Sequence, residues 1–209
     1  MKRNAQVFIS LSILTILLSD LSKTLLNTNH LIISSIAEQL SNVQIKEVLN
    51  LQKKWEWLNY IFIPITIFLK ISIIAAILDI GCFFFSKQIK YKRLFNIVVK
   101  AEFIFLLVIV FKTAWFYFFQ TDYTLEDLQS FYPLSVLNII GSQGLEAWFI
   151  YPFQVLNLFE VAYWFILAYF IGKEINDTTE KGLSIVASSY GVGLLIWIVG
   201  VMFLTLNMS

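Results

Sequence analysis

Five ionisable side chains lie inside long apolar stretches of this sequence, and they are its first candidates for chemistry. The five are Lys70, Asp79, Glu102, Lys112 and Glu160. Ionised groups are costly in an apolar environment, so they are usually paired with one another or face a polar cavity. Two roles stay open for them: static ion pairs that orient helices, or a relay that carries a proton or an ion.

The depth of each charge along its expected helix predicts its partner. With a rise of about 1.5 Å per residue, Lys70 and Glu160 lie near the middle of their apolar stretches. Lys112 lies about 10 Å below one end of its own stretch. We therefore expect an ion pair between Glu160 and either Lys70 or Lys112.

The two remaining charges are expected closer to the opposite boundary. Asp79 and Glu102 each lie about 10 Å inside it, measured along their helices. Lys100 is close to the same boundary in the sequence. Asp79 is therefore expected to approach Lys100.

Polar and small residues mark two further helix surfaces. Gln154, Asn157 and Glu160 recur at i, i+3 and i+6, so they are expected to share a face that looks into a bundle or towards a partner. No run of Ser, Thr, Asn and Gln lines one face as a hydrated path, which favours static pairing over a relay. A second surface allows close contact between helices and is formed by Ser184, Ala187, Ser188 and Gly191.

Common catalytic and metal-binding patterns are absent from the sequence. It contains one histidine, His30, and one cysteine, Cys82, so neither a histidine-based metal centre nor an internal disulfide is possible. No HExxH, GxSxG or Walker pattern occurs. We expect a protein that is not an enzyme, without metal or cofactor, and a net charge of +1 argues against nucleic acid as a partner.

The elements that position these residues are predicted to be membrane-spanning helices. Hydrophobic residues make up 58% of the chain and its mean hydropathy is +0.76, far above the values of soluble domains. A span needs about 20 apolar residues. The prediction is a single all-α polytopic membrane bundle with five spans and two outer segments: spans 5–26, 60–85, 95–119, 148–171 and 183–206, and outer segments 27–59 and 120–147.

The first span is the weakest of the five because its apolar centre is short and Asp20 and Lys23 follow it. A cleaved signal peptide is the alternative. No small-x-small cleavage site follows Leu18, which favours a retained helix.

The distribution of basic residues predicts orientation. No lysine or arginine occurs from Thr113 through Gly172. A basic cluster lies elsewhere in the chain and consists of Lys87, Lys90, Lys92, Arg93 and Lys100. Short cytoplasmic loops collect positive charge, so this cluster is expected inside, which gives an N-in, C-out topology. Lys46, Lys53 and Lys54 are the contrary signal, because this topology puts them outside.

One outer segment has apolar residues at near-helical spacing among charged ones. This pattern predicts an amphipathic helix that lies on the membrane, on a partner or on its own bundle. Its candidate partner face is formed by Ile33, Ile36, Leu40 and Val43. The other outer segment begins a short helix at Thr124 and is interrupted at Pro133, Gly141 and Gly144.

Three stretches of the chain resemble the Yip1 family. The segments 156–173 and 181–187 are similar to that family's last two spans, and 92–102 is similar to the entry into its third span. The resemblance implies five spans with N-in, C-out topology and no catalytic activity. The Asp-Leu-Tyr-Gly-Pro-type motif and the long cytosolic N-terminal region of eukaryotic relatives are missing, so binding to Rab-type GTPases is not implied.

Bacterial relatives in that family imply a protein of the bacterial cytoplasmic (inner) membrane that acts beside another membrane complex, such as an ABC-type exporter. Our first hypothesis is therefore a non-enzymatic accessory or scaffold subunit surrounded by membrane lipids. The alternative is a small permease or ion-coupled transport subunit that uses Lys70, Lys112 and Glu160.

Overall fold

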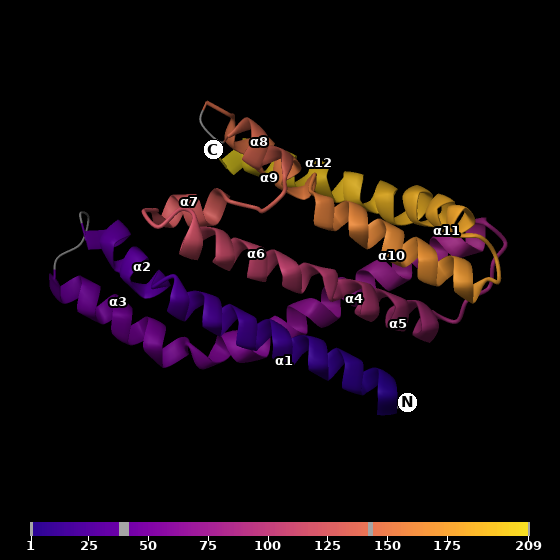
Figure 1. Cartoon of the computed structure of the whole chain (residues 1–209), viewed down its shortest axis with the longest axis horizontal. Helices are drawn as coiled ribbons and strands as arrows, with labels where there is room; N and C mark the ends of the chain where they lie inside the picture. The colour runs from indigo at the N-terminus through magenta and orange to yellow at the C-terminus, as the bar shows by residue number, and fades with distance from the viewer. Residues whose placement is uncertain (1, 38–41, 142–143, 209) are drawn as a thin grey trace.

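The computed structural model describes residues 2–37, 42–141 and 144–208, which are helical apart from short connections (Figure 1). One isolated β-bridge joins Ser135 to Asn157 in this part of the chain. The helices run roughly along one direction, and the two termini lie towards opposite ends of the molecule. The expected all-α architecture is confirmed.

In the described part of the chain, four helices are long and apolar enough to cross a membrane. They cover Ala5–Leu25, Trp57–Phe84, Tyr91–Phe118 and Thr179–Met208. Four of the predicted spans, 5–26, 60–85, 95–119 and 183–206, coincide with them. By element, these helices are α1 (Lys2–Leu25), α4 (Trp57–Phe84), α5 with α6 (Tyr91–Glu102 and Ile104–Phe118), and α11, a π-helical turn η1 and α12 (Thr179–Val186, Ala187–Gly191 and Val192–Met208).

The predicted span 148–171 is wrong as a single helix. The chain forms α9 (Ala147–Val155) and α10 (Leu158–Glu174), with a break between them. Asn157 has extended backbone angles, and its side chain accepts a hydrogen bond from the Glu160 N–H at 2.8 Å, which starts a new helix. The backbone groups freed by the break bond to the segment before α8: Val136 N–H donates to Leu156 O, and Leu158 N–H to Leu134 O.

The first outer segment forms two helices, α2 (Thr28–Ala37) and α3 (Asn42–Trp55). Ile33 lies on α2 and is half-buried, whereas Val43 lies on α3 and is 68% exposed. Because the two residues belong to different helices, they do not share one helical face. Leu40 and the side chain of Ile36 lie outside the described residues.

The second outer segment contains α7 (Leu125–Ser130) and α8 (Val136–Ile140). The predicted helix start at Thr124 is confirmed, because Thr124 and Asp127 form a reciprocal capping box. Leu128 of α7 packs on Leu26 and Phe116, which ties this segment to the ends of α1 and α6.

The main core lies between α4, α5, α10 and α11, where Ile71, Val98, Leu167 and Ile185 are fully buried. The helix α1 packs along α4, α5 and α6. The helix α9 packs against α12 and α10 packs against α11, so the broken pair follows the last long helix along its length.

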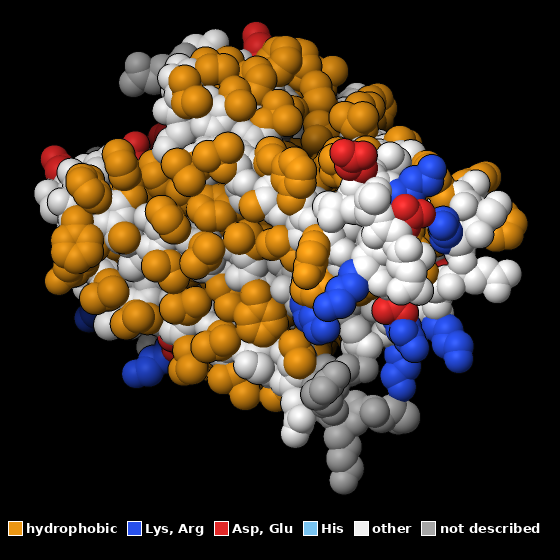
Figure 2. Space-filling model, turned by 45° about the vertical axis from the view of Figure 1, so that its right-hand side comes forward, with side chains coloured by type: hydrophobic (Ala, Val, Ile, Leu, Met, Phe, Trp, Pro, Cys, Tyr) orange, Lys and Arg blue, Asp and Glu red, His pale blue; other side chains and the backbone are white. Residues whose placement is uncertain are grey.

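Charged side chains gather on one side of the surface, next to a broad hydrophobic face (Figure 2). The same end of the molecule holds the α4–α5 loop and the α10–α11 turn, at the right of Figure 1. Two ion pairs join these connections there: Lys87 with Asp177 at 3.2 Å, and Arg93 with Glu174. We call this region the charged end.

Candidate functional site: a polar pocket inside the bundle

A pocket of about 760 Å³ lies between α4, α9, α10 and the η1–α12 helix. Most of its wall is apolar, with Ile73, Ile77 and Leu194 among the lining residues. Into this apolar wall are set the polar side chains of Lys70, Thr66, Tyr132, Tyr151, Gln154, Asn157, Glu160 and Tyr190. A concave, mainly apolar site with a few convergent polar groups is typical of small-molecule binding.

The ionisable groups of this region lie at one level of the bundle. Along their helices, Lys70 is about 21 Å from Phe84 and Glu160 about 21 Å from Glu174. Glu102 and Tyr190 are each about 16 Å from the start of their helices at the charged end. In a bilayer with a hydrocarbon core of about 30 Å, this level is close to the middle.

Lys70 forms its ion pair with Glu102 and not with Glu160. Its Nζ lies 3.0 Å from Glu102 Oε2 and 4.0 Å from the centre of the Phe105 ring. Glu102 is buried, and its Oε1 atom has no hydrogen-bond partner among the described residues. A smaller pocket of about 330 Å³ is lined by both members of the pair, so Lys70 borders two cavities.

Glu160 is held by hydrogen bonds from aromatic side chains. Its Oε1 accepts from the Tyr190 hydroxyl at 2.7 Å and from Trp164 Nε1 at 3.1 Å. The predicted pairing of Glu160 with Lys70 or Lys112 is therefore wrong. The reason is the early start of α5: the helix begins at Tyr91, four residues before the expected 95, which places Glu102 about 6 Å deeper and level with Lys70.

The other two predicted charges stand apart from the pocket. Lys112 on α6 is half-buried, and Asp79 on α4 is exposed on the helix surface. Neither forms an ion pair within the part of the chain that the structure describes. Lys100 lies over the Phe170 ring at 5.3 Å instead of meeting Asp79, so that pairing is wrong too.

Three helices depart from regular geometry at the level of the pocket. The chain is interrupted at Phe103, directly after Glu102, and again at Leu156 and Asn157, just before Glu160. Tyr190 belongs to the π-helical turn η1, and π-turns occur frequently at functional sites. Each irregularity is therefore next to a polar residue of this region.

The predicted polar face is broken by the interruption between α9 and α10. Gln154 lies on α9 and its Nε2 donates to Ser130 O at 3.0 Å. Asn157 Nδ2 donates to the carbonyls of Gln154 and Val155, both at 2.9 Å, which are left free where α9 ends. The three residues do not share one helical face, yet all three line the pocket.

Three of the four predicted small contact residues, Ser184, Ala187 and Ser188, are exposed. Gly191 is the exception, because a Cβ there would lie 2.6 Å from the Trp164 ring. The closest contacts involve glycines that the sequence analysis missed. A Cβ on Gly182 would lie 2.0 Å from the Ala168 carbonyl oxygen, and one on Gly81 would lie 2.4 Å from Ser189 Cβ.

Aromatic residues of the site were also missed. Tyr190 and Trp164 bind Glu160, and Tyr132, Tyr151 and Trp197 line the pocket. A usable signal was present for Tyr190: its hydroxyl lies within an apolar span, where a buried Tyr O–H usually requires a partner.

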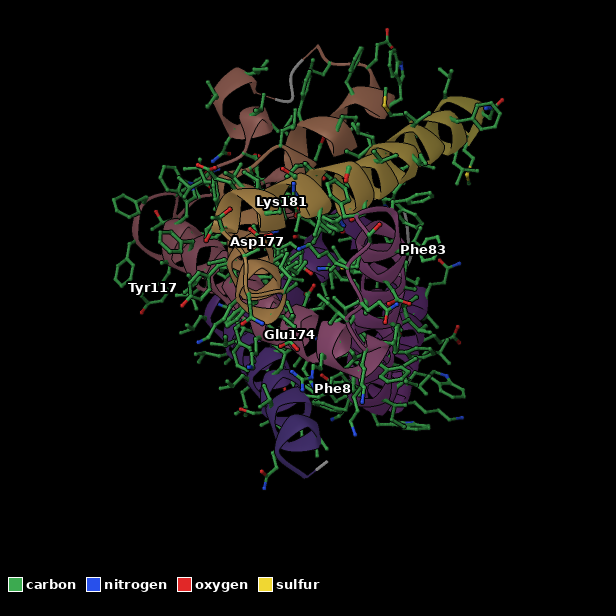
Figure 3. The ribbon with its side chains drawn as sticks, turned by 90° about the vertical axis from the view of Figure 1, so that its right-hand side faces the viewer. Phe8, Phe83, Tyr117, Glu174, Asp177 and Lys181 are labelled. Atoms are coloured by element: carbon green, nitrogen blue, oxygen red, sulfur yellow. The ribbon has the colours of Figure 1, made fainter. Side chains whose placement is uncertain are left out.

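Most ionisable side chains of the charged end are more exposed than Glu160 in the pocket. In Figure 3, Glu174, Asp177 and Lys181 lie on the end that faces the viewer. Hydrogen bonds from the Thr178 N–H and from Lys87 hold the pKa of Asp177 below its usual value. Phe83 and Tyr117 are directed outward on opposite sides of the molecule, in keeping with their exposure of 76% and 49%.

No known protein family, curated protein or solved structure matches the chain. Among the described residues, no group of three or more His, Cys, Asp and Glu could hold a metal ion.

Proposed function

We propose that this chain is a small permease or ion-coupled transport subunit that binds its solute in the central pocket. The observation that supports it most is that Glu160 and Lys70, the ion-pair partner of Glu102, line one cavity at the level where α9 and α10 are separated by a break and two other helices depart from regular geometry. Discontinuous helices at the membrane midplane recur in the binding sites of transporters. A purely static role needs ion pairs but no cavity around them.

The proposed topology has five crossings, with α9 and α10 together forming the fourth. Support comes from their packing along α11 and α12, and from termini towards opposite ends of the molecule, as an odd number of crossings requires. The proposed orientation has the charged end in the cytoplasm, and the basic residues Lys87 in the α4–α5 loop and Arg93 near the start of α5 support it. We place the protein in a bacterial inner membrane, which agrees with the resemblance to the Yip1 family.

Fusions of alkaline phosphatase test this topology. A fusion after Ser209 is expected to be active because the C-terminus is proposed to lie outside, and a fusion after Lys90 is expected to be inactive. Reversed activities would contradict the orientation.

Water access to the pocket tests the transport proposal directly. In a Cys82→Ala background, Leu194→Cys in the pocket wall is expected to react with a charged methanethiosulfonate reagent in membranes. Ile196→Cys on the same helix is the matched control, since Ile196 is 69% exposed on the outside of the bundle and does not line the pocket. If both cysteines were equally protected from reaction with the reagent, the pocket would be closed to water, and transport through it would be refuted.

An accessory subunit that binds another membrane complex is the second candidate. The supporting observation is the amphipathic helix α3. Its apolar residues Val43 and Leu51 are 68% and 57% exposed, and the same helix carries Lys46, Lys53 and Lys54. A double variant, Val43→Asp with Leu51→Asp, is expected to disrupt copurification of a partner under this candidate and to leave it unchanged under the first.

A further inference from the structure

We infer that the central pocket binds a monovalent organic cation with an apolar body, and that binding releases a proton from Glu160. This inference rests on the proposed function and names the class of solute. It is argued from the balance of charge, from the aromatic lining and from the shape of the cavity.

The charges around the pocket do not cancel. Lys70 is matched by Glu102 at 3.0 Å, which leaves the carboxyl of Glu160 without a cationic partner within 4 Å among the described residues. Tyr190 and Trp164 both donate to Oε1, and neither hydrogen bond uses Oε2. An ionised carboxylate in this apolar setting requires a compensating positive charge, which is either a proton or a bound cation.

A second buried carboxyl group lies beside this site. Glu102 is 6% exposed, and its Oε1 has no hydrogen-bond partner in the described residues. Glu102 also lines the smaller pocket, which shares Lys70 and Phe105 with the central one. With both carboxyl groups ionised and one lysine at this level, the region carries a net negative charge, so loss of the Glu160 proton favours a cation over an anion.

The aromatic lining suits an organic cation. Tyr132, Tyr151, Tyr190 and Trp197 all line the pocket, and a cation is attracted to the faces of such rings within about 6 Å. Lys70 already shows this contact, with its Nζ 4.0 Å from the Phe105 ring centre. Ile73, Ile77 and Leu194 offer apolar area to the rest of the molecule, and about 760 Å³ accommodates a ligand of drug-like size.

Release of a proton from Glu160 follows from the same balance of charge. When the pocket is empty, the Glu160 carboxyl keeps a proton; when a cation binds, that proton passes to water and the net charge is unchanged. The ionisable groups around Glu160 are Lys70 on α4, Glu102 on α5, Tyr132 before α8, Tyr151 on α9, Tyr163 on α10 and Tyr190 on η1. Of these, Lys70 and Glu102 form a pair, so Glu160 is the group that exchanges its proton for the cation.

Equilibrium dialysis of the full-length protein in detergent tests the inference, with tetraphenylphosphonium as the probe and tetraphenylborate as its anionic counterpart. We expect saturable binding of the phosphonium only, with an affinity that rises with pH, by up to about tenfold per pH unit, for as long as binding releases the proton of Glu160. Glu160→Gln is expected to weaken binding at least tenfold, and Glu160→Asp to retain it. Gel filtration checks that each variant is folded, and Glu174→Gln at the charged end is the matched control.

Preferential binding of tetraphenylborate, or phosphonium binding that Glu160→Gln leaves intact at all pH values, would overturn the inference. Absence of saturable binding while Leu194→Cys is labelled would also overturn it, and would leave the proposed transport function standing. Protection of Leu194→Cys would refute the transport function itself. The two failures are therefore distinguishable.

Discussion

The charged end and the central pocket use the same kinds of side chain for different purposes. At the charged end, Lys87 and Arg93 meet carboxylates in water, and α10 and α11 approach so closely that only glycine fits at Gly182. At the pocket, α10 begins after a break and α11 continues into the π-turn η1, and Lys70 and Glu160 lie beside a cavity. The charged end is therefore built from close backbone packing and surface ion pairs, whereas the middle of the bundle holds a cavity with polar groups in its wall.

The largest expected effect comes from breaking the ion pair beside the pocket. Glu102→Gln leaves Lys70 without its charge partner, and we expect a loss of about 3 kcal/mol in the free energy of unfolding, the lower end of the range for buried pairs because Lys70 is half-exposed. The measurement is denaturant unfolding in detergent micelles. Adding Lys70→Met should restore most of the loss, and additive effects of the two changes would contradict the pairing.

The next effect concerns the tight packing of α10 on α11. In Gly182→Ala, the new Cβ would lie 2.0 Å from the Ala168 carbonyl oxygen, and backbone on both sides leaves little room for adjustment. We expect a destabilisation of about 1–3 kcal/mol, which exceeds the helix propensity gained. Gly200→Ala is the control, because nothing lies within 4 Å of its Cβ position. Equal melting temperatures of the two variants would contradict close packing at this end.

A smaller effect is expected at the break that opens the pocket. Asn157→Ala removes the cap of α10 and the hydrogen bonds to the end of α9, at a cost of about 1 kcal/mol. The affinity for tetraphenylphosphonium should fall by a larger free energy than the free energy of unfolding does, because Glu160 lies in the first turn of α10 and depends on this cap for its position. Unchanged binding affinity in this variant would show that the break does not position Glu160.

The smallest effect is expected at the ion pairs of the charged end. Lys87→Ala should hardly change the unfolding midpoint at pH 7, because exposed ion pairs contribute little. The pKa of Asp177 is lowered, so its contribution is complete above the ordinary aspartate pKa of about 3.9 and is lost as the pH falls through its folded-state value. In a pH titration of the melting temperature, Lys87→Ala should therefore differ slightly from the parent above about pH 4, and the small difference should disappear as the pH falls further. A large difference at pH 7 would mean that this end is buried against another surface.

Patterns along the sequence predicted the parts of the structure that depend on local composition. The helices around Lys70, Lys112 and Tyr190 follow from long apolar stretches, and the helix start at Thr124 follows from a threonine that precedes acidic residues in the first turn. Membrane helices are predictable because transfer of each residue into an apolar environment contributes almost independently of its distant neighbours.

Only the tertiary structure decided which polar groups meet. Glu102 is a partner of Lys70 because α5 begins earlier than its apolar run suggests, and the helix break at Asn157 exists because its free backbone groups bond to residues 134–136. Glu160 binds Tyr190, 30 positions away, through a π-turn that apolar periodicity does not reveal. The sequence by itself determined where helices form and that buried charges need partners, whereas pairing and the pocket depend on helix register and on contacts between distant segments, to which hydropathy is insensitive.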